Sequence, residues 1–132
     1  MITRRFILAA AAYGACLSPC GALPFSAARR FGDAASRLRA LVPAPESARE
    51  IGRIYLAGRT GEVGAGTLTD LILSSMSLDE GTIVALDKQA LSARLTSRVR
   101  ADFAKGLTVE IGGWILSRTE TCLCALWTET RA

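Results

Sequence analysis

KGLTVEIGGWILSRTETCLCALW, residues 105–127, is the stretch in which several local signals agree on one fold. Its first half alternates apolar and polar side chains, which places Val109 and Ile111 on one face of a short strand. The pair Gly112–Gly113 suits a two-residue hairpin turn, and a second apolar run follows it directly. The stretch therefore predicts one short β-hairpin near residues 107–117.

Three Ser/Thr-to-acid pairs mark predicted helix starts. In a capping box, a hydroxyl accepts from a helix N–H while an acid three residues later accepts from the N–H of the capping residue. The pairs with this spacing are Ser47–Glu50, Thr67–Asp70 and Ser117–Glu120. We expect helices to begin at these pairs. Gly52 lies in the helix expected to begin at Ser47–Glu50. It either weakens that helix or lets another backbone come close.

The strongest helical pattern begins after Asp87, which we expect to be the N-cap. Apolar side chains recur near i, i+4 spacing from Leu91 to Phe103, and Gly106 is placed to end the helix. The expected solvent face carries Lys88, Arg94, Arg98, Arg100, Asp102 and Lys105. These arginines form either a patch for an anionic ligand or a solvated helix face, and we favour the solvated face.

The remaining segments complete a mainly α fold. Residues 29–45 are interpreted as a basic, proline-containing linker or a loosely attached first helix that starts at Asp33. The apolar run 82–86 is ambiguous, and we favour a brief turn there. We therefore expect a small bundle of four or five helices with one hairpin, in a single domain over residues 46–132.

The N-terminus predicts export. Two arginines, Arg4 and Arg5, directly precede an uncharged run that extends to Ala28, and Thr3-Arg4-Arg5-Phe6-Ile7-Leu8 resembles the twin-arginine (Tat) signal pattern. The run is interrupted by glycine and proline, which favours a cleavable signal, with cleavage after Ala28, over a membrane span. The alternatives are a general secretory signal and a lipoprotein signal ending at Cys20. Residues 1–28 are thus the expected signal peptide.

Charge argues against nucleic acid as a partner. The net charge is +4, but residues 1–40 hold six arginines and one acid, so 10 Lys/Arg and 11 Asp/Glu remain in residues 41–132. A phosphate-backbone surface needs a clustered basic face. The expected folded part is close to neutral, and we expect its membrane contact to be transient and through the signal only.

Few side chains suit catalysis or cofactor binding. The chain has no histidine, which excludes His-dependent triads and most zinc sites. Residues 60–66 are glycine-rich, but they follow a helix and lack the ending of a phosphate loop, so we expect a flexible turn and not nucleotide binding. The acidic residues show no catalytic pattern. We therefore predict no cofactor, no metal and no enzyme activity, with a small enzyme as the third hypothesis.

Cys122, Cys124 and Trp114 are the candidate interface residues. In a helix the two cysteines lie about 200° apart and cannot bridge each other. We expect one thiol in the core and the other nearer the surface, where it could pair with a partner protein. Trp114 is expected either to anchor the hairpin by packing, which we favour, or to be an exposed interface anchor.

The C-terminal half carries a further resemblance. Asp102-Phe103, Gly106, Val109, residues 113–120 and residues 123–126 resemble the C-terminal pattern of small Tat-exported bacterial proteins of uncharacterised function. The overall layout is similar to that of small subunits that accompany membrane-associated flavin dehydrogenases through export. The resemblance implies a periplasmic or secreted protein, the Tat translocase as a partner, and a role as accessory or escort subunit of a larger exported oxidoreductase. A stand-alone periplasmic binding or structural protein is the alternative.

Overall fold

The computed structural model describes residues 33–59 and 63–129. This part of the chain is mainly helical, with one two-stranded antiparallel hairpin, which confirms the predicted fold class. The signal residues Arg4 and Arg5, the cleavage position after Ala28, and the cysteines at 16 and 20 lie outside the described residues, as do residues 60–62 of the glycine-rich connection.

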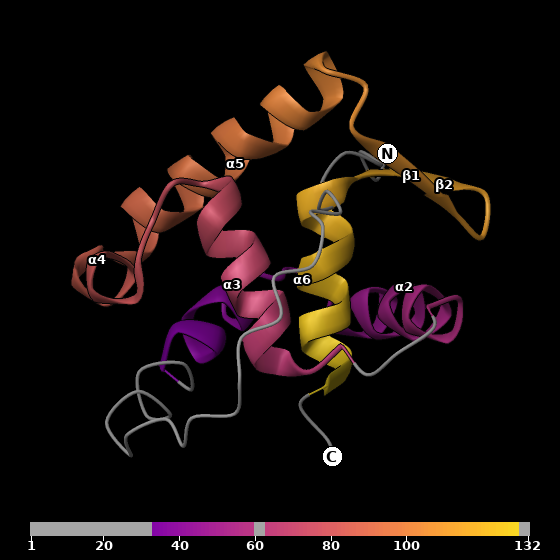
Figure 1. Cartoon of the computed structure of the whole chain (residues 1–132), viewed down its shortest axis with the longest axis horizontal. Coiled ribbons are helices and arrows are strands. Elements are labelled where there is room, and N and C mark those ends of the chain that lie inside the picture. The colour runs from indigo at the N-terminus through magenta and orange to yellow at the C-terminus, as the bar shows by residue number, and fades with distance from the viewer. Residues whose placement is uncertain (1–32, 60–62, 130–132) are drawn as a thin grey trace, which may run out of the picture.

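The elements follow one another with short connections (Figure 1). In chain order they are a helical segment over residues 33–39, α2 (Pro45–Ala57), α3 (Ala65–Ser75), α4 (Glu80–Ala85), α5 (Lys88–Ala104), β1 (Thr108–Ile111), β2 (Trp114–Ser117) and α6 (Arg118–Thr128).

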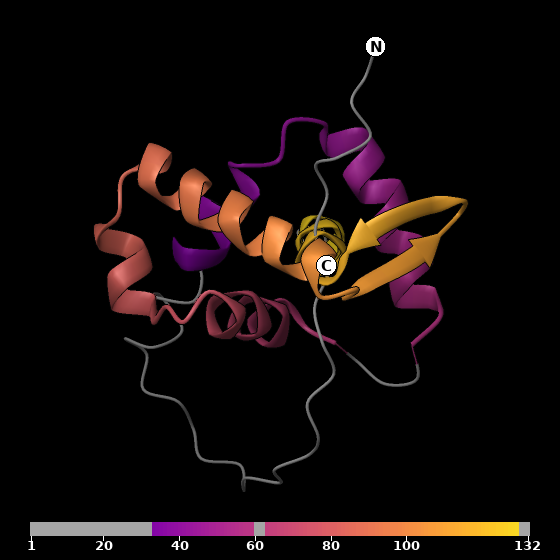
Figure 2. The ribbon, with the colours of Figure 1, turned by 90° about the horizontal axis from the view of Figure 1, so that it is seen from above.

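Helix α6 lies at the centre of the molecule. Figure 2 looks along it and shows α2, α3, α5 and the hairpin arranged around it. Every side chain from Thr119 to Leu126 is buried, so α6 has no solvent face over two turns. A helix of this kind is an interior element and not an amphipathic surface helix.

Two hydrophobic clusters lie on different sides of α6. The larger one joins Cys122 and Leu126 to α3, α4, α5 and the segment 33–39; its large members include Leu38, Leu68, Ile72, Ile83, Leu91 and Leu95. The smaller one joins Cys124 to α2 and the hairpin through Ala48, Ile51, Ile111 and Leu116. Cys122 and Cys124 lie on different sides of α6, so this helix contacts both clusters and connects the hairpin to the bundle.

Gly52 is the position where α2 meets α6. A Cβ atom at Gly52 would lie 2.6 Å from the carbonyl carbon of Cys124 and would also collide with Thr128. The expectation that Gly52 lets another backbone come close is therefore confirmed. The contact lets the two helix backbones nearly touch.

Two of the three predicted capping boxes are wrong. Helix α2 begins at Pro45, whose fixed φ suits the first helical turn, and its N-cap Ala44 makes no side-chain hydrogen bond. Helix α3 begins at Ala65 after Gly64, again without a side-chain cap. Both helices start two residues before the predicted pair. The capping box of Ser117 and Glu120 is confirmed.

Helix α4 corrects the prediction of a turn at residues 82–86. The side chain of Asp79 accepts a hydrogen bond from the backbone N–H of Thr82 at 2.7 Å and caps the helix, and Ile83 is fully buried. The cap and the single buried anchor explain why so short a helix forms. The next predicted N-cap, Asp87, is confirmed by its 2.7 Å bond from the N–H of Ala90.

The segment 33–39 is helical, which confirms the first-helix interpretation for this part of residues 29–45; the linker alternative and the expectation of a loose attachment are wrong, because the segment is firmly packed. Ala34 and Leu38 are fully buried in the larger cluster. Arg39 donates to the carbonyl of Leu126 at 3.1 Å, and Trp127 Nε1 donates to the carbonyl of Arg39 at 3.2 Å. These bonds tie the segment to the C-terminal end of α6.

The hairpin has the predicted turn. Gly112 and Gly113 have φ of +56° and +80°, the left-handed values that a type I′ turn needs at both central positions. The register pairs Ile111 with Trp114 and Glu110 with Ile115. Paired residues share a face, so Trp114 lies on the face of Ile111 and Ile115 lies on the opposite face.

Candidate functional site

A buried polar cluster links α3, α5 and α6, and Asp102 is at its centre. This residue was expected on the solvent face of α5, but only 1% of it is exposed. Asp102 follows Val99 by three residues and Leu95 by seven, so it continues the buried stripe of the helix. Phe103, which was expected to continue that stripe, is instead 38% exposed.

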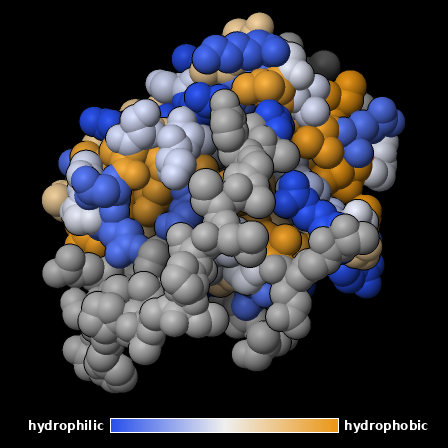
Figure 3. Space-filling view, in the orientation of Figure 1, coloured by the Kyte–Doolittle hydropathy of each residue, from blue (hydrophilic) through white to orange (hydrophobic). Residues whose placement is uncertain are grey.

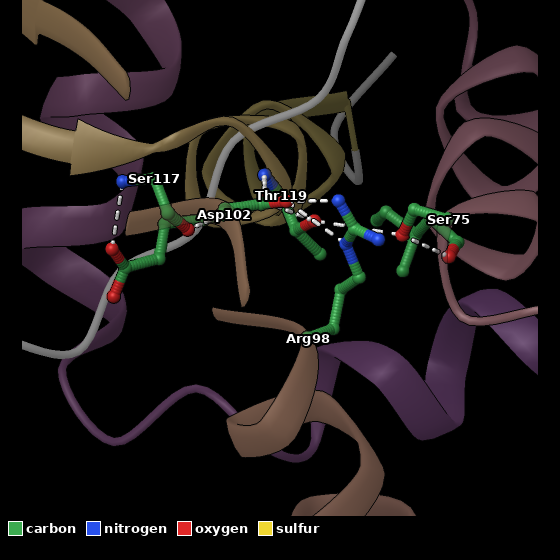
Figure 4. A network of polar contacts seen from close by, with 7 residues as sticks. Ser75, Arg98, Asp102, Ser117 and Thr119 are labelled. Carbon is green, nitrogen blue, oxygen red and sulfur yellow. Dashed lines mark hydrogen bonds and ion pairs between the residues drawn. The ribbon is translucent and has the colours of Figure 1, made fainter. Parts of the chain in front are cut away.

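Both carboxylate oxygens of Asp102 are occupied (Figure 4). Oδ2 accepts from the backbone N–H of Thr119 at 3.1 Å and from its hydroxyl at 2.8 Å. Oδ1 accepts from Arg98 Nε at 2.9 Å and from a terminal nitrogen of the same guanidinium. Arg98 is thus held by a bidentate contact one helical turn before Asp102, and its charge offsets the buried carboxylate.

Ser75 extends the cluster to the end of α3. Its hydroxyl donates to the carbonyl of Ile72 at 2.7 Å and lies 3.5 Å from the hydroxyl of Thr119. In Figure 4 the guanidinium of Arg98 lies between Asp102 and Ser75. Three helices that are distant in sequence therefore meet at the first turn of α6.

Glu120 is a second buried carboxyl in the same turn. Its Oε2 accepts from the backbone N–H of Ser117 at 2.9 Å, whereas its buried Oε1 has no hydrogen-bond partner among the residues that the structure describes. Burial, with a smaller contribution from the negative charge of Asp102, raises the pKa of Glu120 to about 8, against the hydrogen bonds from Ser117, which lower it. Burial therefore favours the protonated form of this carboxyl in the folded protein.

The chemistry of this cluster is structural. Asp102 and Glu120 are each 1% exposed, so neither carboxyl can reach a substrate in this structure. The cluster instead provides acceptors for the backbone N–H groups at the buried start of α6, which have no partner within the helix. Among residues 33–59 and 63–129, no group of three or more Cys, Asp or Glu side chains is placed to hold a metal ion.

Both cysteines are buried, which corrects the expectation that one thiol lies near the surface. Cys122 and Cys124 are free thiols with 0% and 1% exposure, and they belong to different hydrophobic clusters. Burial raises the pKa of Cys122 to about 11 and that of Cys124 further. Because α6 is central, either side of it faces the core, and neither thiol is available at the surface to pair with a partner protein.

The hairpin exposes two large apolar side chains. Trp114 is 43% and Ile115 63% exposed, so the packing role favoured for Trp114 is at best partial. Figure 1 shows the hairpin projecting from the bundle with its turn at the edge of the molecule, and Figure 3 shows apolar surface on that side. Ile54 of α2, 43% exposed, lies close to the turn, 3.8 Å from the position a Cβ of Gly112 would take.

Sequence reasoning found some of these residues and missed others. Trp114 was singled out, and its neighbour Ile115 was not, although the alternation of the strand puts it on the outer face. Asp102 was assigned to solvent, although its spacing from Leu95 and Val99 signals the inner face. No sequence signal identifies Ser75 as the partner of Thr119, because 44 residues separate them.

Comparison of the chain with family models, with curated proteins and with solved structures gives no match. Within the part of the chain that the structure describes, no helix has the length and apolar character needed to cross a membrane.

Proposed function

We propose that this chain is an exported, non-catalytic protein that acts through protein contact, as an accessory or escort subunit of a larger exported oxidoreductase. The observation that carries the proposal is the hairpin, which presents Trp114 and Ile115 on a projecting element. Tryptophan is enriched among the residues that dominate binding energy at interfaces. The Tat-like residues Arg4 and Arg5 support export in a folded, partner-bound form.

The hairpin is suited to contact because its two faces differ in role. Ile111 and Leu116 bury one face on α2 and α6, which holds the hairpin rigid, whereas Ile115 on the other face is the most exposed large apolar side chain described. A rigid support reduces the conformational entropy lost on binding. The partner implied by this chemistry has an apolar surface that accepts Ile115 on the outer face and extends around the turn to Trp114, which lies on the opposite face and is 43% exposed.

A stand-alone periplasmic binding or structural protein is the second candidate. The observation that favours it is the completeness of the core, since α6 is already surrounded by elements of this chain. Such a protein would remain monomeric and soluble without a partner.

Affinity purification of the tagged full-length chain from its native host tests the first candidate. We expect a stoichiometric flavin- or haem-containing protein to copurify with the wild type and with the control Val84→Ala, which removes an equally exposed apolar side chain from α4. The double variant Trp114→Ala/Ile115→Ala should lose that protein. If the partner still copurifies with the hairpin variant, the contact lies elsewhere on the chain. If no partner copurifies with the wild type, the second candidate is favoured.

The escort role is tested separately through the signal. If the chain carries a partner through export, Arg4→Lys/Arg5→Lys should leave both proteins in the cytoplasm. Cell fractionation with antibodies to each protein measures this outcome. A partner that still reaches the periplasm when this chain does not would refute the escort role and leave the contact itself intact.

A further inference from the structure

An open groove of about 420 Å³ lies between the end of α3 and the middle of α5. Its polar lining residues are Ser75, Ser77, Ser97, Arg94 and Arg98. The hydroxyl of Ser75 already donates to the carbonyl of Ile72, so the serine donors that remain for a ligand are Ser77 and Ser97. Arg94, Ser97 and Arg98 are at i, i+3 and i+4 along α5 and therefore share one face of that helix.

Ser77 has a strained backbone at the rim of this groove. Its φ is +54°, and it is the only described residue other than glycine with a positive φ. It ends α3 with the N–H of Ser77 bonded to the carbonyl of Ser74 and the N–H of Leu78 bonded to the carbonyl of Leu73. This is the Schellman arrangement, in which glycine usually takes the left-handed position.

Helix α5 ends in the same arrangement with the usual residue. Gly106, at φ +67°, bonds to the carbonyl of Phe103, and Leu107 bonds to that of Asp102. The chain therefore uses glycine at one such end and serine at the other. Serine costs conformational free energy there that glycine would not. What serine adds in return is a hydroxyl on a residue that lines the groove.

Arg98 is pre-positioned at the inner wall. Asp102 holds its Nε and one terminal nitrogen, and the other terminal nitrogen has no hydrogen-bond partner in residues 33–59 and 63–129. Arg94 makes no ion pair with any described residue. Because Asp102 offsets the charge of Arg98, the groove keeps about one positive charge, from Arg94.

We propose that this groove binds the phosphate group of a small molecule. A tetrahedral phosphate presents several acceptor oxygens in different directions and can take bonds from two guanidinium groups and from hydroxyls at once. A planar carboxylate would leave part of this donor set unused. The site goes beyond the proposed function and does not depend on it, since it lies on α3 and α5 and not on the hairpin.

Titration of the full-length chain with inorganic phosphate, followed by calorimetry and by NMR of backbone amides and arginine Nε–H groups, tests the site. We expect saturable shifts at Ser77, Arg94 and Arg98, and weaker binding of acetate. Arg94→Gln should weaken phosphate binding about tenfold. The matched control is Arg100→Gln, which removes the same charge from the same helix outside this groove and should change binding by less than about twofold.

Ser77→Gly separates the ligand role from a structural one. This variant should be more stable than the wild type, because glycine suits the left-handed backbone, and yet bind phosphate several-fold more weakly. A repeat with glycerol phosphate distinguishes a phosphate ester from free phosphate as the ligand, since an ester that uses the remaining volume binds more tightly. Equal weakening by Arg94→Gln and Arg100→Gln, no saturable binding, or unchanged binding by Ser77→Gly would overturn the proposal.

Discussion

Thr119 donates both its backbone N–H and its hydroxyl to one oxygen of Asp102, at 3.1 and 2.8 Å. A carboxylate from α5 thus satisfies an N–H in the first turn of α6, one of the groups that a helix cannot bond internally. The negative charge also lies at the positive end of the α6 dipole. Ser117 and Glu120 satisfy the neighbouring groups from within α6, so this helix start is held from two directions.

Asp102→Ala should destabilise the protein strongly. The substitution leaves the partly buried Arg98 without its counter-charge and the N–H of Thr119 without an acceptor, and breaking a buried pair costs on the order of 3 kcal/mol. Urea unfolding followed by circular dichroism measures the change. Asp70→Ala is the control, because Asp70 is exposed and forms no hydrogen bond or ion pair with described residues, and its effect should stay within about 0.5 kcal/mol. Equal effects would show that the Asp102 contacts contribute little.

Glu120 should make the stability fall as the pH rises. Its pKa is about 8 in the fold and about 4.5 when exposed, so between these values the folded state binds more protons than the unfolded state. Its contribution is complete below pH 4.5 and is lost as the pH rises through 8, by up to about 1.4 kcal/mol per pH unit.

Glu120→Gln should flatten this dependence. Glutamine can still accept the hydrogen bond from Ser117 in the capping box, but it does not ionise. Unfolding free energies at pH 6 and pH 9 give the slope, and Glu50→Gln at the surface should leave the slope as in the wild type. A wild-type slope that survives in Glu120→Gln would assign the titration to another group.

Gly52→Ala should be among the most damaging single-methyl changes. The new Cβ would lie within 2.6 Å of the Cys124 carbonyl carbon, so α2 and α6 would have to separate. Overpacking of this kind costs about 1–3 kcal/mol or more. Gly66→Ala in α3 is the matched control, because its Cβ would meet nothing within 4 Å and should stabilise the helix by about 0.5–1 kcal/mol. Opposite signs for the two variants in thermal unfolding are the expected result.

Ser77→Gly and Gly106→Ser should change the stability in opposite directions. Ser77→Gly should raise stability by about 1 kcal/mol, and Gly106→Ser should lower it by a similar amount, because both positions have left-handed φ. Denaturant midpoints of the two variants provide the measurement. A loss of stability in Ser77→Gly would mean that the serine side chain makes a contact worth more than the strain.

The two cysteines should resist modification in the native state. Their burial and raised pKa both lower the amount of thiolate that can react. A thiol reagent should label Cys122 and Cys124 slowly in buffer and quickly in denaturant, with the native rate set by opening of the fold. Fast labelling of the native protein would contradict the central position of α6.

Local signals in the sequence predicted the elements better than their packing. The Gly112–Gly113 turn, the Ser117 capping box and the Asp87 cap each depend on neighbours within three residues, and each is confirmed. The predicted starts of α2 and α3 were wrong because α2 begins at Pro45 and α3 begins after Gly64, both ahead of the hydroxyl residues that were expected to cap them. Such competition between local signals is decided by which backbone angles the flanking residues allow.

The candidate site was harder to predict because its contacts are distant in sequence. Asp102 meets Thr119 across 17 residues and Thr119 meets Ser75 across 44. The burial of Cys122 and Cys124 on opposite sides of α6 follows from the enclosure of that helix by α2, α3, α5, the segment 33–39 and the hairpin. Periodicity cannot reveal this, since a helix buried on all sides has no polar face to mark its orientation.

The enclosure of α6 has a consequence for synthesis. The surrounding helices leave the ribosome before the helix on which they all pack, so their apolar faces have no permanent partner until residues 118–128 emerge. Tertiary structure can then be acquired only after translation of every described element, in a single late step. Nascent chains of this protein should therefore depend on holding factors in the cell until residues 118–128 have been synthesised, and the supply of those factors becomes part of what determines the yield.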